Sequence, residues 1–362
     1  MIRTPLVSVL NTCILLFLWI FSVNDLSAQC CAVGGGNPMA SDLSQSVLPK
    51  GTLEVGVAGQ FIHTTRFLNY REPDTSYLDS YTSQYLYPRV SYGVTPDLTI
   101  SVEAGYFLRK EQTGSHPTDN ITSKGIGDLI VMPRLQLFNR NHTEITAGIG
   151  IKVPLGSYND SLGYIEPFSG NEYFMPKPPA MQGSTGSNDF VFNIFGMRRF
   201  DGGSWRVFSN FTYILRGWNP LGERFGDVAT FSLFGGRAVG ERMMVLVHAK
   251  YEWIGEMSLN PDIMMFTFPN YDPEATGSKK LFCMPQVNYR LGEGLHAFVF
   301  AEIPLWQHVN KIQMASQIMA TAGISYRFPL AKPSERLRGL DSLNSLGSLG
   351  GLGSLGVARC QR

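Results

Sequence analysis

The sequence predicts an all-β fold, a transmembrane antiparallel up-and-down β-barrel of about 12 strands. Three observations predict this class. Apolar residues alternate with polar or small residues along about twelve segments. Long and short connections alternate between those segments, and aromatic residues lie near the segment ends.

The amino-acid composition excludes several other classes of protein. Of the 362 residues, 44% are hydrophobic and only 16% are charged, against roughly 25% charged in an ordinary soluble domain. The net charge of +1 provides no basic stripe for phosphate backbones, so no nucleic-acid partner is expected. After the amino terminus, no run approaches the roughly 18 apolar residues that a spanning helix needs, which excludes a helical membrane protein.

Residues 1–28 are predicted to form a secretory signal peptide. Arg3 supplies the positive charge, Cys13 to Val23 form the apolar core, and the segment ends at the small residue Ala28. An uncleaved anchor helix needs a longer apolar run than this one. Lipid attachment at the cysteine pair that follows is disfavoured, because a small residue normally precedes a modified cysteine.

Two regions flank the predicted barrel, which spans residues 51–328. Residues 29–50 are either a lumen plug or a flexible periplasmic leader, since they are too short and glycine-rich for a domain. Residues 329–362 contain a Leu, Ser and Gly repeat and are predicted to form a low-complexity flexible tail.

The alternation is clearest over residues 143–153. Ile149 and Ile151 share one face there and Lys152 points to the other, because successive strand side chains point to opposite sides. The predicted strands cover residues 51–67, 84–93, 98–109, 126–138, 143–154, 189–199, 205–218, 227–239, 242–254, 280–290, 295–305 and 314–328. In 227–239 the pattern is less regular and places Phe231 and Leu233 on the face that is polar elsewhere.

The connections sort by length. Those at 68–83, 110–125, 155–188, 219–226, 255–279 and 306–313 are long, and short turns lie between them. Over an even number of strands, this alternation is typical of a bacterial outer-membrane barrel with long loops outside, short turns in the periplasm and both termini periplasmic. Outer-membrane lipid and the barrel-assembly machinery are the expected partners.

A soluble β-sandwich also alternates in this way, with its apolar face inside. Segment length favours the membrane, since a tilted spanning strand needs about 9 to 11 residues. Aromatic residues near the segment ends, among them Tyr92, Tyr289 and Tyr326, favour it as well.

The alternation points a set of charged residues into the lumen, because Arg or Lys on the lipid face costs about 2 to 4 kcal/mol near the bilayer centre. These lumen-lining candidates are Glu54, Arg89, Glu103, Asp128, Arg134, Glu144, Lys152, Arg206, Arg216, His248, Lys250, Glu252, Arg290, His296 and Glu302. They form either a structural network across the barrel or, in part, the lining of a solute path. About twelve strands predict a narrow or obstructed lumen.

The connection at 155–188 is rich in aromatic residues, proline and glycine. Exposed apolar residues in a long outer loop are typical of a surface that contacts a solute or a partner. A loop that packs on itself over the barrel is the alternative.

No catalytic or cofactor arrangement is evident. The histidines match no metal-binding pattern, G-x-S-x-G is absent, and Cys30, Cys31, Cys283 and Cys360 match no zinc or redox pattern. Residues 125–128 suggest a phosphate loop only superficially, because no helix follows them. We expect no enzyme, no cofactor and no metal.

Three short motifs carry a family resemblance: residues 125–129 (GIGDL), 183–189 (GSTGSND) and 304–310 (PLWQHVN). With them the chain resembles outer-membrane barrels of the phenol meta-pathway transporter-like family over about residues 30–328. Its leader, Cys30-Cys31 followed by residues 34–38 (GGGNP), is similar to members from the Bacteroidetes group. The resemblance implies a barrel that passes small hydrophobic or aromatic compounds, and it transfers no binding residue. The tail after Phe328 departs from outer-membrane barrels that end at an aromatic residue.

The predicted function is an outer-membrane channel or transporter for passive passage of small hydrophobic or aromatic solutes. The alternatives are a structural or surface-interaction barrel with a closed lumen, and an outer-membrane hydrolase. Transport predicts a continuous lumen, or a lateral opening where Pro88, Pro133 or Pro285 removes a hydrogen bond between strands.

Overall fold

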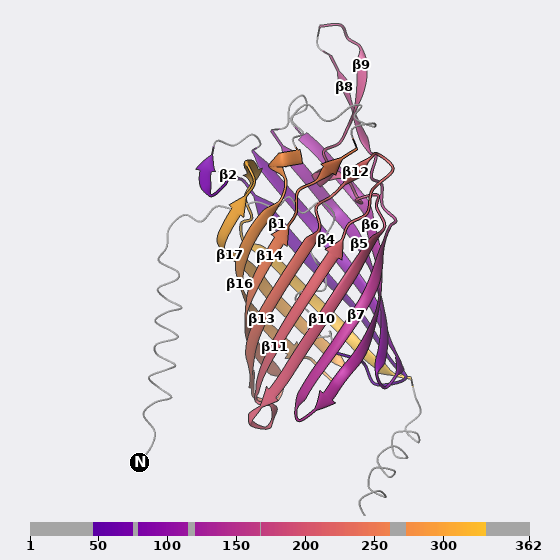
Figure 1. Cartoon of the computed structure of the whole chain (residues 1–362), viewed down its shortest axis with the longest axis vertical. Coiled ribbons are helices and arrows are strands. Elements are labelled where there is room, and N and C mark those ends of the chain that lie inside the picture. Colours follow the sequence, from indigo (N-terminus) through magenta and orange to yellow (C-terminus); the bar gives the residue numbers. More distant parts are fainter. Residues whose placement is uncertain (1–45, 75–78, 115–119, 167, 261–272, 331–362) are drawn as a thin grey trace, which may run out of the picture.

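Twelve antiparallel strands close into a single barrel, which confirms the predicted all-β class (Figure 1). The structure is a computed structural model that describes residues 46–74, 79–114, 120–166, 168–260 and 273–330. Each barrel strand pairs with the one before it in the chain, and the last pairs with the first from Thr52↔Pro329 to Ile62↔Met319. Among the described residues, no helix is long and apolar enough to cross a membrane.

The barrel strands lie on the twelve predicted segments, but several of their ends differ. They are β1 (Thr52–Thr64), β4 (Ser80–Thr95), β5 (Leu98–Thr113), β6 (Asn120–Arg140), β7 (Thr143–Pro154), β10 (Asp189–Phe200), β11 (Trp205–Leu215), β13 (Val228–Val239), β14 (Met243–Ile254), β16 (Ser278–Arg290), β17 (Leu295–Val309) and β19 (Met319–Pro329). For example, β4 begins at Ser80 rather than 84 and β17 continues to Val309 rather than 305. The connection predicted at 110–125 is mostly strand, because pairing of β5 with β6 continues to Thr113↔Asn120. The last strand begins at Met319 rather than 314, since Met314 pairs with Phe67 in a separate sheet.

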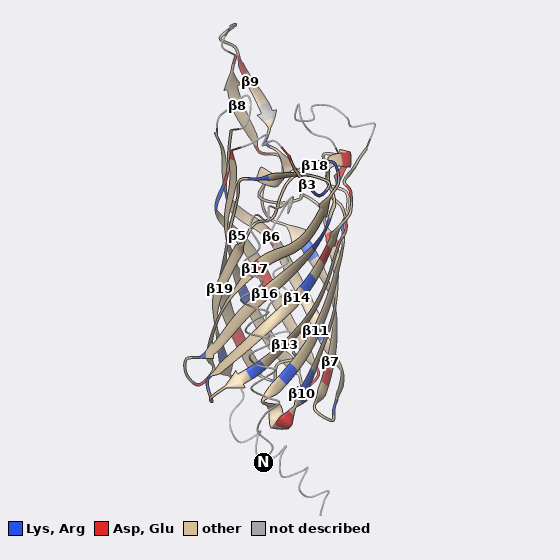
Figure 2. Cartoon of the chain, turned by 90° about the vertical axis from the view of Figure 1, so that its left-hand side faces the viewer, with Lys and Arg blue, Asp and Glu red and all other residues tan. Residues whose placement is uncertain are grey.

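The two ends of the barrel differ. The short turns and both chain ends of the barrel lie at one end, here called the turn end, and the long connections lie at the other, the loop end. The loop end carries three small sheets: β2 (Phe67–Asn69) between β3 (Glu72–Asp74) and β18 (Ile312–Met314), β8 (Ser161–Ile165) with β9 (Glu172–Pro176), and β12 (Glu223–Arg224) with β15 (Ser258–Leu259). Figure 2 shows the β8–β9 hairpin projecting well beyond the barrel.

Side chains alternate between the lumen and the outer surface on the barrel strands. On β14, Leu246 and His248 are buried, whereas Val245 and Val247 are 39% and 50% exposed on the outside. The sequence-based placement of Phe231 and Leu233 is wrong. These residues are 48% and 51% exposed on the outer face of β13, because Thr230 and Ser232 take the inward positions between them.

The chain reaches β1 along the inner wall of the turn end. Leu48 is 3% exposed, and its backbone N–H donates to the inward-facing hydroxyl of Thr99 at 2.7 Å. Gly93 permits this approach, because a Cβ there would lie 2.2 Å from the carbonyl oxygen of Pro49. The described end of the leader therefore lies inside the barrel. Residues 29–45 of the proposed plug, the signal peptide and nearly all of the tail fall outside the described residues.

The outer face of the strands predicts a position-dependent cost for a charge. Ile149 is 62% exposed at the middle of β7, and we expect Ile149→Arg to lower the free energy of unfolding in lipid vesicles by about 2–4 kcal/mol. Val239→Arg, next to the turn end on the same face, is the matched control and should cost about 0–1 kcal/mol. Equal costs in a guanidinium titration would contradict the placement of these residues in lipid.

Candidate functional site

The loop end of the lumen is closed by the returning half of the long connection at 155–188. After the β8–β9 hairpin, the chain turns inward through a 3-10 turn at Pro179–Met181. Met181 is fully buried in an apolar cluster with Phe67 and Tyr81. Lys110 holds this turn from below by donating to the carbonyl oxygens of Ala180 at 3.1 Å and Gln182 at 2.5 Å. Residues 179–182, here called the mouth segment, thus obstruct the lumen.

The outward half of the same connection has the opposite character. On the β8–β9 hairpin and its tip, Ile165, Phe168 and Phe174 are 65%, 99% and 69% exposed. The connection therefore combines both predicted alternatives, because one half exposes apolar side chains and the other packs over the barrel.

A buried ion cluster anchors residues 183–189 beneath the mouth segment. Asp128 accepts hydrogen bonds from Lys152 and Ser184. Asp189 lies 2.9 Å from Lys152 and 3.0 Å from Arg216. Two carboxylates and two cations neutralise one another in a site from which water is largely excluded, where removal of one partner is expensive. Two of the motifs quoted above, at 125–129 and 183–189, meet in this cluster.

A second charged cluster lies towards the turn end. Glu54 pairs with Arg327 and lies 3.5 Å from Arg89. Arg134 donates to Ser101 at 2.5 Å. These contacts link β1, β19, β4, β5 and β6 across the inner wall, so this part of the lumen is narrowed by large charged side chains.

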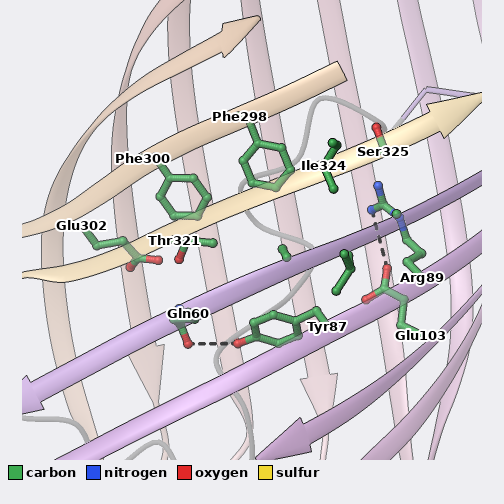
Figure 3. Close-up of a pocket in the computed structure, with 13 residues that line it drawn as sticks. Gln60, Tyr87, Arg89, Glu103, Phe298, Phe300, Glu302, Thr321, Ile324 and Ser325 are labelled. Carbon is green, nitrogen blue, oxygen red and sulfur yellow. Dashed lines mark hydrogen bonds and ion pairs between the residues drawn. The ribbon is translucent and has the colours of Figure 1, made fainter. Parts of the chain in front are cut away.

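A cavity with aromatic walls adjoins the second cluster, since Arg89 and Glu103 line it (Figure 3). It is lined by residues of β1, β4, β5, β17 and β19. Phe298 and Phe300 form one wall, and their rings are stacked with a centroid distance of 6.1 Å. Tyr87 lies opposite and donates to Gln60 at 2.9 Å.

The cavity also contains polar oxygens with unused acceptor capacity. Within the described part of the chain, neither carboxylate oxygen of Glu103 nor the hydroxyl of Thr321 has a hydrogen-bond partner, although both residues are about 95% buried. Arg89 lies 3.7 Å from Glu103, which is an ion pair without hydrogen-bond geometry. Because an ionised carboxylate only accepts hydrogen bonds, this arrangement suits a ligand that donates one.

The structure places the fifteen lumen-lining candidates in two groups. The buried ones are Glu54, Arg89, Glu103, Asp128, Arg134, Glu144, Lys152, Arg216, His248, Lys250 and Glu302. Arg206, Glu252 and His296 are partly exposed, and Arg290 is exposed at the turn end, where it donates to the carbonyl oxygen of Glu241. Three sets are brought together: Glu54 with Arg89 and Glu103, Asp128 with Lys152 and Arg216, and Lys250 with Glu252 and Glu302. Whether any of them contacts a solute remains a prediction.

His248 does not take part in a recognisable catalytic arrangement. Its ring stacks on Phe234 with a centroid distance of 4.2 Å, and neither ring nitrogen has a hydrogen-bond partner among the described residues. The described residues also contain no group of three or more His, Cys, Asp or Glu that could hold a metal ion. Cys283 is a free thiol, and the other four cysteines fall outside the described ranges.

Sequence reasoning missed several residues of the site. Asp189 shares its face with Val191 and Asn193 and could have been assigned to the lumen from the first position of its predicted strand. Phe298 and Phe300 share a face with Glu302, so the same alternation points them inward. They were missed because only charged residues were assigned to the lumen.

The three prolines interrupt the hydrogen bonding between strands without shifting it. The pairing of β4 with β5 passes from Leu86↔Tyr106 to Arg89↔Glu103, with Pro88 in the gap. Similar gaps at Pro133 and Pro285 separate β6 from β7 and β16 from β17. Proline has no N–H to donate, which explains each gap. A lateral opening of the wall at these positions remains a prediction.

The comparisons with known proteins agree on the fold. No protein-family model and no curated protein matches the chain. Among solved structures, the COG4313 outer membrane channel from Pseudomonas putida F1 is similar with a TM-score of 0.60 and 14% identity, covering 80% of this chain and all of that one. The β domain of the Bordetella autotransporter BrkA gives a TM-score of 0.45 and 13% identity, covering 76% and 99%. A mutant of the monoaromatic hydrocarbon channel TodX gives a TM-score of 0.38 and 10% identity, covering 77% of this chain and 91% of that one.

The similarity to the Pseudomonas channel shows an outer-membrane β-barrel fold. At 14% identity, the likeness to the Pseudomonas channel extends to the fold alone. The resemblance to the phenol meta-pathway transporter-like family and to its Bacteroidetes members stays a prediction.

The ion cluster predicts that Asp189→Asn releases the loop beneath the mouth. Loss of one carboxylate leaves Lys152 and Arg216 with an excess of positive charge in a buried site, and we expect a stability loss of about 3–5 kcal/mol. Thr185→Cys, in a chain whose own cysteines are replaced by serine, should then react faster with a membrane-impermeant maleimide. Glu111→Gln is the matched control, because its pair with Arg109 lies on the exposed rim. Equal labelling rates in the two variants would contradict the anchoring role.

Proposed function

We propose that the protein is a channel of the bacterial outer membrane that passes small, largely apolar solutes through its lumen. The loop end then faces the exterior, and both ends of the barrel chain face the periplasm. The observation that carries the proposal is the aromatic cavity beside Arg89 and Glu103. A concave site with mostly apolar walls and a few convergent polar groups is the usual form of a small-molecule site.

The chemistry of the cavity supports a defined class of solute. Phe298, Phe300 and Tyr87 offer ring faces and edges to an apolar or aromatic body. Glu103 and Thr321 offer oxygens without a hydrogen-bond partner among the described residues, and Glu103 is ion-paired with Arg89. A site with unused buried acceptors discriminates against an analogue that lacks the donor, because the oxygens then stay unpaired. The proposed solute is therefore a small aromatic or aliphatic molecule that carries a hydroxyl or amino group.

Two features support passage that is gated rather than freely open. The mouth segment obstructs the loop end, and Leu48 and Pro49 lie along the inner wall of the turn end. The prolines give an alternative exit. Tyr87 and Glu302 line the cavity, and each lies within a gap in strand pairing that contains a proline, Pro88 and Pro285 respectively. A solute in the cavity is therefore close to two weakly bonded parts of the wall.

A second function is favoured by one observation. The β8–β9 hairpin exposes Ile165, Phe168 and Phe174 far from the lumen, as a surface that binds another molecule would. A surface-interaction barrel with a closed lumen accounts for this hairpin, but it leaves the aromatic cavity without a role.

The mouth segment predicts a conductance phenotype. The double variant Lys110→Ala/Met181→Gly removes both the hydrogen bonds and the apolar contact that hold the segment, so steady single-channel conductance in planar bilayers should rise several-fold over the unaltered chain. Arg109→Ala is the control, because that side chain points outward at the same rim. A closed channel in the double variant would contradict passage through the lumen and would favour passage through the wall or the surface-interaction barrel.

The cavity predicts selectivity between two similar solutes. Benzyl alcohol carries a donor and toluene does not, so we expect the alcohol to reduce the conductance of the opened variant at lower concentration. Glu103→Gln should reduce this preference for the alcohol, since the amide supplies only one acceptor oxygen where the carboxylate supplies two. Phe300→Ala should weaken block by both solutes about equally. Equal block by both solutes in the unaltered cavity would contradict the proposed solute class.

A further inference from the structure

The outer surface of the barrel carries a basic cluster at the loop end. Lys279 of β16 and His308 of β17 are register partners and point outward, since their neighbours Lys280 and Val309 are buried in the lumen. Arg71, at the turn between β2 and β3, lies over the ring of Trp306 with its guanidinium carbon 5.1 Å from the ring centroid. Arg71, Lys279 and His308 are here called the rim cluster.

The backbone that carries the rim cluster is held by a hydrogen bond between the β2–β3 turn and β17. The backbone N–H of Val309 donates to the carbonyl oxygen of Tyr70 at 2.9 Å, which ties the β2–β3 turn to the end of β17. The rings of Tyr70 and His308 lie 5.9 Å apart. The Trp306 ring and the hydrogen-bonded turn place Arg71 at the end of β17, and a guanidinium group can bind an anion in bidentate fashion.

The depth of the cluster matches a lipid headgroup. On β16, outward residues run from Tyr289 at the turn end to Lys279 at the loop end, a distance of ten residues. At about 3.3 Å per residue and a tilt of about 40°, this is about 25 Å along the barrel axis, the height of the apolar band of an outer-membrane barrel. Trp306 and Leu281 face outward one step closer to the middle. Lys279 and His308 therefore lie where the acyl chains end.

The cluster also has an excess of positive charge. The ion pairs of the described residues include none for Arg71 or Lys279. Two acids of the same rim are engaged elsewhere: Glu274 pairs with Lys311 at 2.6 Å, and Glu256 accepts from Asn310 at 2.8 Å. By contrast, Arg109 on the other side of the rim is neutralised by Glu111 at 2.6 Å.

We propose that Arg71, Lys279 and His308 bind a phosphate group of a glycolipid in the leaflet around the loop end. Arg71 and Lys279 supply charge-assisted hydrogen bonds to the phosphate oxygens, and the imidazole of His308 supplies a further donor. Trp306 and Leu281 contact the first carbons of the acyl chains below it. The site rests on the loop end facing the exterior, and it is independent of whether the lumen passes solutes.

Binding of lipid A to the full-length protein in detergent micelles tests this site. Native mass spectrometry would compare bisphosphorylated lipid A, the same lipid after phosphatase treatment, and inorganic phosphate. We expect the unaltered chain to retain the bisphosphorylated lipid, and the double variant Arg71→Gln/Lys279→Gln to bind it at least about tenfold more weakly. Arg109→Gln is the matched control and should bind as the unaltered chain does. Heat-modifiable migration on a gel shows whether each variant is folded. If the double variant does not fold, the single variant Lys279→Gln is used in its place.

Three results would overturn the proposal. Equal retention of the dephosphorylated lipid would show that the acyl chains alone account for binding. An equal loss of affinity in Arg109→Gln would show an effect of rim charge in general. Inorganic phosphate that displaces the lipid at a concentration similar to that of lipid A itself would indicate a free-phosphate site instead.

Discussion

The closure of the sheet is the constraint on which the rest of the structure depends. Lipid offers no hydrogen-bond partner to backbone N–H and C=O groups, so a spanning sheet must have no free edge. The pairing of β1 with β19 meets this requirement over eleven residue pairs. Closure fixes one surface of the sheet against lipid and the other around a lumen. Every inward side chain must then fit inside the lumen of a twelve-stranded barrel.

That confined interior explains why the lumen holds ion pairs and aromatic rings together. Charged residues that cannot face lipid are directed inward, where they need partners because little water remains. They form one cluster around Asp128 and Asp189, another around Glu54 and Arg89, and a third around Lys250. Rings from β4 and β17 lie beside Arg89, Glu103 and Glu302 in the cavity. The cavity therefore combines apolar walls with charged groups of two of these clusters.

The fold followed from the sequence more completely than the site did. Alternation with a period of two specifies both the strands and their lumen face, and it worked for β7 and β14, where apolar and polar residues are well separated. It failed at Phe231 and Leu233, because Thr230 and Ser232 are small and weakly polar and leave the pattern ambiguous. The contacts of Lys110 with Ala180 and of Lys152 with Asp189 join residues 70 and 37 positions apart. No periodicity contains such information, since it arises from the path of a long connection.

The connection between β7 and β10 has a mechanical consequence. Its exposed hairpin ends at Pro176 and the mouth segment begins at Pro179, so only two residues separate them. Lys177, at this junction, is fastened to β6 through the carbonyl oxygen of Thr122 at 2.9 Å and the hydroxyl of Ser123 at 3.1 Å. The hairpin and the mouth segment thus share one short junction that is fixed to the barrel wall. A substitution of Lys177 would therefore remove an attachment common to the exposed hairpin and to the segment at the loop end of the lumen.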